Sequence, residues 1–264
     1  MRSLPLTLAL ALLLSACGYD SAAPPEASTT ENAGEAPAEE LAATAAAAEV
    51  EDLAAREASV PENPLKDAYF GETHLHTGVS MDAFIGGNRL TPDDAYRFAK
   101  GEELMVNGSP HRIKRPLDFC AVTDHSEFMG EAYSLMNPGA PGYDHPVAKS
   151  FREAEDLDTA LGLYGKYVLE PLSTGGDPHP PFFQGEEAIA STWQKNYEAT
   201  ERHYEPGTFT TIHGYEWTSA PGGANLHRNV LFRDANVPEI PFSSNESADP
   251  EDLWAWRAWS RSSR

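Results

Sequence analysis

Histidine and carboxylate side chains, which are common protein ligands of metal ions, gather in short segments of this sequence. His74 and His76 are separated by one residue, and successive side chains of an extended segment point to opposite faces. The two imidazoles therefore lie on one side of such a segment, within reach of the same cation. Neutral imidazole suits zinc, iron, nickel and copper, and carboxylates beside it extend the choice to manganese.

Two further segments carry the same residue types. Asp124 and His125 directly follow an apolar run, and Glu216 and His227 come later in the chain. A single pair of histidines also fits ordinary hydrogen bonding inside a core, but three clusters together favour a metal centre. Asp124 is a candidate catalytic carboxylate that orients a ligand, and a helix cap is an equally open interpretation.

Arg228 follows the last of these histidines and is a candidate for binding a substrate anion. Its guanidinium can meet a carboxylate or phosphate through two parallel hydrogen bonds, and a structural salt bridge is the open alternative. The sequence contains neither the G-x-S-x-G elbow of serine hydrolases nor a phosphate-cradling glycine loop. Serine-hydrolase and P-loop chemistry therefore have no support.

Short strand-like runs alternate with helical stretches from about residue 67 onward. The helix expected at 91–101 has a capping threonine, a proline at its first position and a terminal glycine. Polar groups beyond the carboxyl ends of parallel strands are typical of α/β barrels and open α/β sheets. Strands are expected at 68–74, 117–123, 208–217 and 225–232, and a long insertion at 126–206 is expected to hold helices at 150–169 and 186–204.

The N-terminus has the features of a bacterial lipoprotein signal peptide, expected at residues 1–16. Arg2 makes its start positive, and the apolar run 4–14 is too short to span a bilayer comfortably. Residues 14–18, Leu-Ser-Ala-Cys-Gly, resemble a lipoprotein box, so Cys17 is the expected lipidation site. Because Gly18 is not aspartate, the outer membrane is favoured over the inner one. A plain secretory signal with an incidental cysteine is the alternative.

The segment 17–66 is expected to be a linker that leads to a domain at 67–264. Residues 20–66 carry 11 acidic and 2 basic residues and are rich in alanine, proline, serine and threonine. Such a composition buries too little apolar surface to offset its chain entropy, which predicts a disordered spacer. The formal net charge of −22 argues against nucleic acid as a partner. Cys120 lies in an apolar run and is predicted to be a buried thiol.

The motifs and their order resemble the PHP superfamily, named for its polymerase and histidinol-phosphatase members. More narrowly, they are similar to a branch known only as a domain of unknown function. The first motif is Tyr-Phe-Gly-Glu-Thr-His-Leu-His-Thr at residues 69–77, and the second spans 118–128. Gly-Tyr-Glu-Trp at 214–217 and His-Arg-Asn-Val at 227–230 complete the set, which covers roughly residues 68–256.

This resemblance implies a distorted (β/α)7 barrel that holds two or three divalent ions, zinc, manganese or iron, at the carboxyl ends of its strands. The implied metal ligands are His74, His76, Asp82, His125, Glu216 and His227. In that arrangement Glu216 is the catalytic carboxylate that bridges two metals, and Asp82 and His125 serve a third. Relatives with such a centre often hydrolyse phosphate esters, and metal-activated water is the nucleophile that a two-metal site supplies.

Relatives carry further ligand motifs beyond this point, so the chain is expected to be an incomplete PHP-like barrel with an open sheet edge. The expected function is that of a membrane-tethered, metal-dependent hydrolase, most simply a phosphoesterase acting on a small-molecule substrate. The alternative is a non-catalytic envelope lipoprotein, a degenerate barrel that acts in binding or scaffolding. Both place the protein on the periplasmic side of the bacterial cell envelope, attached to the lipid bilayer through Cys17.

Overall fold

The computed structural model describes residue 50 and residues 52–262, and these belong to one compact unit that runs from Glu49 to Arg264. The expected signal peptide, Cys17 and most of the 17–66 linker lie outside the described residues. The described part of the linker includes a helix at 52–58. No helix in the described part of the chain is both long and apolar enough to cross a membrane.

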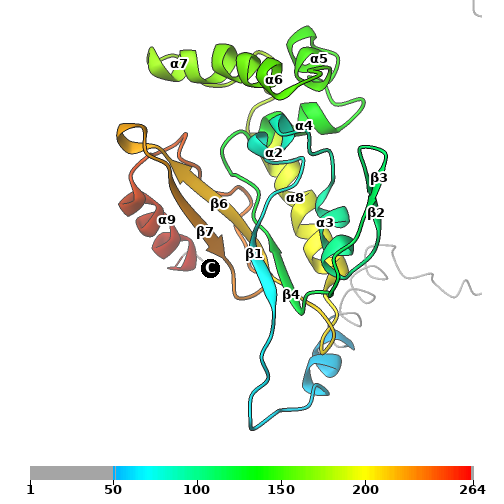
Figure 1. Cartoon of the computed structure of the whole chain (residues 1–264). Helices are drawn as coiled ribbons and strands as arrows, with labels where there is room; N and C mark the ends of the chain where they lie inside the picture. The colour runs from blue at the N-terminus through cyan, green and yellow to red at the C-terminus, as the bar shows by residue number, and fades with distance from the viewer. Residues whose placement is uncertain (1–49, 51, 263–264) are drawn as a thin grey trace, which may run out of the picture. The chain divides into compact units, whose positions relative to one another are not determined.

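Strands and helices follow one another along the domain as Figure 1 shows. The strands are β1 (Gly71–Leu75), β2 (Leu104–Val106), β3 (Ser109–His111), β4 (Phe119–Val122), β5 (Thr210–Thr211), β6 (Gly214–Ser219) and β7 (Leu226–Leu231). The α-helices are α2 (Met81–Ile85), α3 (Pro92–Ala99), α4 (Met129–Met136), α5 (Pro146–Arg152), α6 (Leu157–Tyr164), α7 (Glu170–Ser173), α8 (Glu186–His203) and α9 (Pro250–Ser262). A π-helical turn, η1 (Gly165–Leu169), joins α6 to α7, and a 3₁₀ turn, η2 (Pro221–Gly223), precedes β7.

The central sheet is parallel and has the order β1-β4-β5. After β5 the chain stays beside the segment that follows β4, and His125 of that segment forms a parallel bridge with Glu216. The strand β6 that carries Glu216 then pairs with β7 in the antiparallel direction. The carboxyl ends of β1 and β4 and the middle of the β6–β7 hairpin therefore meet in one region.

The expected mixed α/β chain is confirmed, but the described strands do not close into a barrel. They form the three-stranded parallel sheet and two separate two-stranded sheets, β2–β3 and β6–β7. The strand expected at 208–217 is interrupted at residues 212–213, which divides it into β5 and β6. The strand expected at 225–232 is β7, and it folds back on β6 rather than following a crossover helix.

The β2–β3 hairpin has no counterpart among the expected strands. Asn107 and Gly108 both have positive φ angles, 49° and 77°, in the two-residue turn between the strands. An Asn-Gly pair is the preferred sequence for such a turn, because both residues tolerate the left-handed region. The signal was therefore present in the sequence, but the three-residue strands beside it are too short to show alternation.

The helix α3 begins as its sequence predicts. Thr91 accepts a hydrogen bond from the backbone of Asp94, and the Asp94 side chain accepts one from the backbone of Thr91, which is a complete capping box. Tyr96 on this helix is fully buried and shares a hydrogen bond of 2.9 Å with Thr200 of α8. Figure 1 shows α3 and α8 beside β4, and their contact encloses the buried Cys120.

Cys120 is buried, as its apolar surroundings predict, and burial raises the pKa of its thiol to about 12. Two other apolar clusters hold the rest of the domain. One joins α2 and α4 to the insertion helices α5 and α6, with Phe84, Phe151 and Phe182 at its centre. The second packs α8 and α9 against the β6–β7 hairpin through Trp193, Trp217 and other buried side chains.

Candidate metal centre

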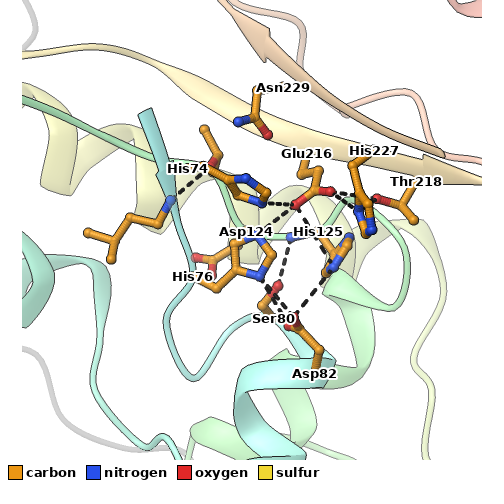
Figure 2. Close-up of polar contacts among 12 residues, drawn as sticks. His74, His76, Ser80, Asp82, Asp124, His125, Glu216, Thr218, His227 and Asn229 are labelled. Carbon is orange, nitrogen blue, oxygen red and sulfur yellow. Dashed lines mark hydrogen bonds and ion pairs between the residues drawn. The ribbon is translucent and has the colours of Figure 1, made fainter. Parts of the chain in front are cut away.

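The strand β1 delivers His74 and His76 to the same side of the sheet. Leu75, between them, points the other way and packs against the cluster beneath α3. The two imidazole rings have centroids 5.0 Å apart. Their Nε2 atoms lie 2.8 Å and 2.7 Å from the same carboxylate oxygen, Oε2 of Glu216 (Figure 2). The two histidines thus lie on one side of the chain and reach the same point, as their spacing in the sequence predicted.

The hairpin β6–β7 supplies Glu216 and His227. Directly opposite residues of an antiparallel pair share one face, and the pairs here are Glu216 with Asn229 and Thr218 with His227. Glu216 is fully buried, and its Oε1 contacts Nδ1 of His227 and accepts a hydrogen bond of 2.8 Å from the Thr218 hydroxyl. Both carboxylate oxygens of Glu216 are therefore in contact with imidazole nitrogens.

His125 joins this group because the segment after β4 forms a parallel bridge with β6 at Glu216. The backbone of Glu216 donates to the carbonyl of Asp124, and Ser126 donates to the carbonyl of Glu216. The Nε2 atom of His125 then lies 4.0 Å from Oε2 of Glu216 and 3.6 Å from Oδ2 of Asp82. The backbone N–H of His125 also donates to the Ser80 hydroxyl, at 2.9 Å, which fixes the turn after β4.

Asp82 reaches the cluster from the first turn of α2. Its Oδ2 lies 3.0 Å from Nδ1 of His76, so His76 contacts Glu216 through one ring nitrogen and Asp82 through the other. Ser80, the residue before the first residue of α2, is fully buried, and its hydroxyl accepts the hydrogen bond from the backbone of His125. The short helix α2 thereby becomes a rigid carrier for Asp82.

These side chains form three overlapping groups in which the potential ligand atoms lie within 4.8 Å of one another. The groups are His74, His76 and Glu216; His76, Asp82 and His125; and His125, Glu216 and His227. Each group shares at least one member with a neighbour, which is the arrangement that adjacent cations with common ligands require. His74, Asp82 and His227 are the exposed members, and they mark the side that solvent can reach.

Carboxylates control the charge of the buried imidazoles. Burial opposes protonation of His76, but hydrogen bonds with Asp82 and Glu216 outweigh it and raise its pKa to about 9. Burial likewise opposes protonation of His125, and Asp82 and Glu127 raise its pKa to about 10. Burial favours the neutral form of Glu216, yet His76, His125 and the hydroxyl of Thr218 lower its pKa to about 2. The pKa of Asp82 is also lowered, because His125 and His76 outweigh its burial.

The donor set fits divalent metal ions. Four imidazoles and two carboxylates offer nitrogen and oxygen ligands, a mixture that suits zinc, manganese and iron. The raised pKa values of His76 and His125 favour their cationic forms, and the lowered pKa values of Glu216 and Asp82 favour their anionic forms. A cation between these groups would supply the positive charge instead and leave the imidazoles neutral.

Asp124, expected to be catalytic, is turned away from the cluster. It is fully buried, and its two oxygens accept from the backbone N–H and the hydroxyl of Thr77, at 2.6 Å and 2.8 Å. Burial raises the pKa of Asp124 to about 6. Because both oxygens accept hydrogen bonds from Thr77, Asp124 holds the turn between His76 and α2.

Arg228, expected to bind a substrate anion, lies on the face of the hairpin opposite to His227. It pairs with Trp217, so its side chain leaves β7 on the side opposite to His227. Its guanidinium donates to the carbonyl of His227, which is a local contact. Alternation along β7 places Asn229 on the same side as His227, where its amide donates to the carbonyl of Thr73, at 2.9 Å. Asn229 and Thr218 are neighbours of the cluster that the sequence motifs did not single out.

Comparison with protein families places the chain in one of them. The family described as a protein of unknown function, DUF3604, matches residues 63–263, and the chain belongs to this family. The comparison with curated proteins gives no match, and neither does the comparison with solved structures.

Proposed function

We propose that this member of the DUF3604 family is a metal-dependent hydrolase that acts on a phosphate ester. The observation that carries the proposal is the position of Glu216, whose buried carboxylate has imidazole nitrogens around both oxygens. A carboxylate so placed can bridge two cations about 3.5–4 Å apart, the separation used by two-metal hydrolases. The resemblance of the motifs to the PHP superfamily supports the same reaction class.

The ligand roles in this proposal follow the three groups. His74, His76 and Glu216 would hold one ion, Glu216 and His227 would hold a second, and Asp82 with His125 would serve a third. Bound ions would lower the pKa of coordinated water and neutralise the charge of the ester. Glu216 is buried and His125 is partly buried, whereas the exposed His74, Asp82 and His227 would be the members open to an incoming substrate.

The proposal also covers the location of the protein. The lipoprotein box at residues 14–18 supports lipidation of Cys17 and attachment to the periplasmic side of the envelope, with the outer membrane favoured. The acidic linker would keep the domain away from the bilayer surface by repulsion from anionic lipids. The hydrolase would then act on small molecules in the periplasm.

Turnover of generic phosphomonoesters and phosphodiesters by the purified protein tests the reaction. We expect activity that a strong chelator abolishes and that added Zn²⁺ or Mn²⁺ restores. Glu216→Gln should remove metal binding and turnover together, because it takes the negative charge from the shared ligand. Glu201→Gln is the matched control, since Glu201 also pairs with a histidine, His213 at 2.6 Å, but lies outside the metal groups.

Two results would contradict the proposal. Activity that survives chelation in a preparation free of metal would show that the cluster is not the catalytic centre. Metal binding without turnover of any ester, amide or lactone would leave a metal-dependent binding protein, which is the non-catalytic alternative raised by the sequence.

A further inference from the structure

Glu127 is a buried carboxylate next to the candidate metal centre but outside the three ligand groups. Its side chain is 8% exposed, and Oε2 lies 3.5 Å from Nδ1 of His125. That nitrogen is buried and has no hydrogen-bond partner that meets strict geometry among the described residues. The carboxylate oxygen of Glu127 is the acceptor within ion-pair distance of it.

The two nitrogens of His125 face different surroundings. Nε2 points to the cluster, where it lies 3.6 Å from Asp82 and 4.0 Å from Glu216. Nδ1 points to Glu127. A histidine that binds a metal through one nitrogen commonly donates its other N–H to a carboxylate, which fixes the tautomer and the direction of the lone pair.

The Glu127 carboxylate is itself held in place from two directions. Its Oε2 accepts from the backbone N–H of Thr218, at 3.1 Å, and its Oε1 accepts from the backbone N–H of Ser244, at 2.7 Å. The Ser126 hydroxyl also donates to Oε1, at 3.2 Å. Thr218 lies on β6, two residues after Glu216. The anchor of His125 is thus tied to the strand that carries the shared carboxylate.

We propose that Glu127 is a positioning residue of the metal centre, which accepts Nδ1–H of His125 and directs Nε2 of that ring to the metal. This inference rests on the proposed metal centre and adds a residue to it. His125 is a member of two ligand groups, whereas the group of His74, His76 and Glu216 does not contain it. Loss of the Glu127 carboxylate should therefore weaken the binding of ions held by His125 and leave the binding of the ion held by His74, His76 and Glu216 unchanged.

A purely structural role for Glu127 makes a different prediction. Glu127 also fixes the turn at Ser244, so its removal would loosen that turn whatever happens at the metals. Ser244→Ala is the matched control, because the Ser244 hydroxyl donates to the carbonyl of Thr218 and holds the same turn without touching His125. Both variants should lower thermal stability, and only the loss of Glu127 should alter the metal centre.

Calorimetric titration with Mn²⁺ alone tests the proposal on the purified protein and its variants. In Glu127→Gln we expect one ion to bind as in the wild type and the remaining binding to weaken about 10- to 100-fold, the usual effect of losing such a partner. Ser244→Ala should bind Mn²⁺ like the wild type. In a His125→Ala background, Glu127→Gln should cause no further loss, since its effect passes through His125.

Nitrogen NMR of the histidines in the Zn²⁺-loaded protein gives a second readout. The wild type should show His125 as a neutral ring protonated at Nδ1, and Glu127→Gln should shift that resonance while the signals of His74 and His76 stay in place. Unchanged Mn²⁺ binding in Glu127→Gln would overturn the inference, and so would an equal loss in Ser244→Ala. A wild type that binds no Mn²⁺ or Zn²⁺ would instead refute the metal centre itself, while binding without ester hydrolysis would refute only the reaction.

Discussion

Metal uptake should expel protons from this centre, because His76 and His125 are protonated near neutral pH when no metal is bound. Their pKa values are raised to about 9 and about 10 by Asp82, Glu216 and Glu127, despite burial. A metal ion needs each imidazole neutral. Proton and metal therefore compete for the same nitrogens, and the competition can be measured by changing pH alone.

The size of the effect follows from the pKa values. At about pH 7, displacing the proton of His76 weakens apparent binding by a factor of about 100, and displacing that of His125 by about 1,000. Between about pH 7 and pH 9 the affinity should rise about tenfold per pH unit for each proton released. Filling the group of His76, Asp82 and His125 should release about two protons.

The stability of the metal-free protein should change in the opposite direction. The raised pKa values of His76 and His125 stabilise the fold fully below about pH 6.5, and this contribution is lost as the pH rises through about 9 to 10. The lowered pKa of Glu216 stabilises the fold above its ordinary pKa of 4.5, and that contribution is lost as the pH falls through about 2. Added metal should thus raise Tm more at alkaline than at neutral pH.

Calorimetric titration with Mn²⁺ in two buffers of different ionisation enthalpy measures the released protons directly. His125→Gln should lower the number of released protons by about one, because one titrating imidazole is gone. His213→Gln is the control, since His213 pairs with Glu201 away from the cluster, and it should leave the number unchanged. Binding that releases no protons, or an affinity that stays constant from about pH 6.5 to pH 8.5, would refute the reasoning.

Three further outcomes are expected. Thr91→Ala removes the hydroxyl of the capping box and should cost about 1 kcal/mol, or about 2–4 °C in Tm by calorimetry, whereas Thr91→Ser should retain most of it. Asp124→Asn should cost about 1–3 kcal/mol in urea unfolding, because the new NH2 group would face one of the two Thr77 donors while only the amide oxygen can still accept; equal stability of variant and wild type would count against the described turn. Cys17→Ala should shift the protein from membrane to soluble fractions or block its maturation, and unchanged mass and fractionation would remove the lipoprotein assignment.

Local sequence features anticipated the parts of this fold that depend on near neighbours. The capping box of α3 needs only Thr91 and the residue three places later, and both are visible in the sequence. The common side of His74 and His76 needs only the alternation of an extended chain. The Asn-Gly turn at 107–108 is local too, and only the shortness of its strands concealed the hairpin.

The resemblance of the motifs to a known superfamily named six candidate ligands, and the structure brings all of them into overlapping groups. Residue type supported this grouping, because histidine and carboxylate side chains seldom cluster without a reason. Residue type alone left Asp124 and Arg228 with both a structural and a functional interpretation, since the same side chains serve both purposes. The structure adds that Asp124 accepts hydrogen bonds from Thr77 and that Arg228 pairs with Trp217 on the hairpin.

Only the tertiary structure decided how the distant segments meet. Glu216 reaches His125 because the segment after β4 forms a parallel bridge with β6 at these two residues, and His227 reaches Glu216 because β7 returns antiparallel to β6. A shift of one residue in either pairing would turn these side chains to the opposite face. Register depends on the packing of whole strands and helices, which no short stretch of sequence contains, so the metal groups and the place of Glu127 behind His125 emerge only when the chain is folded.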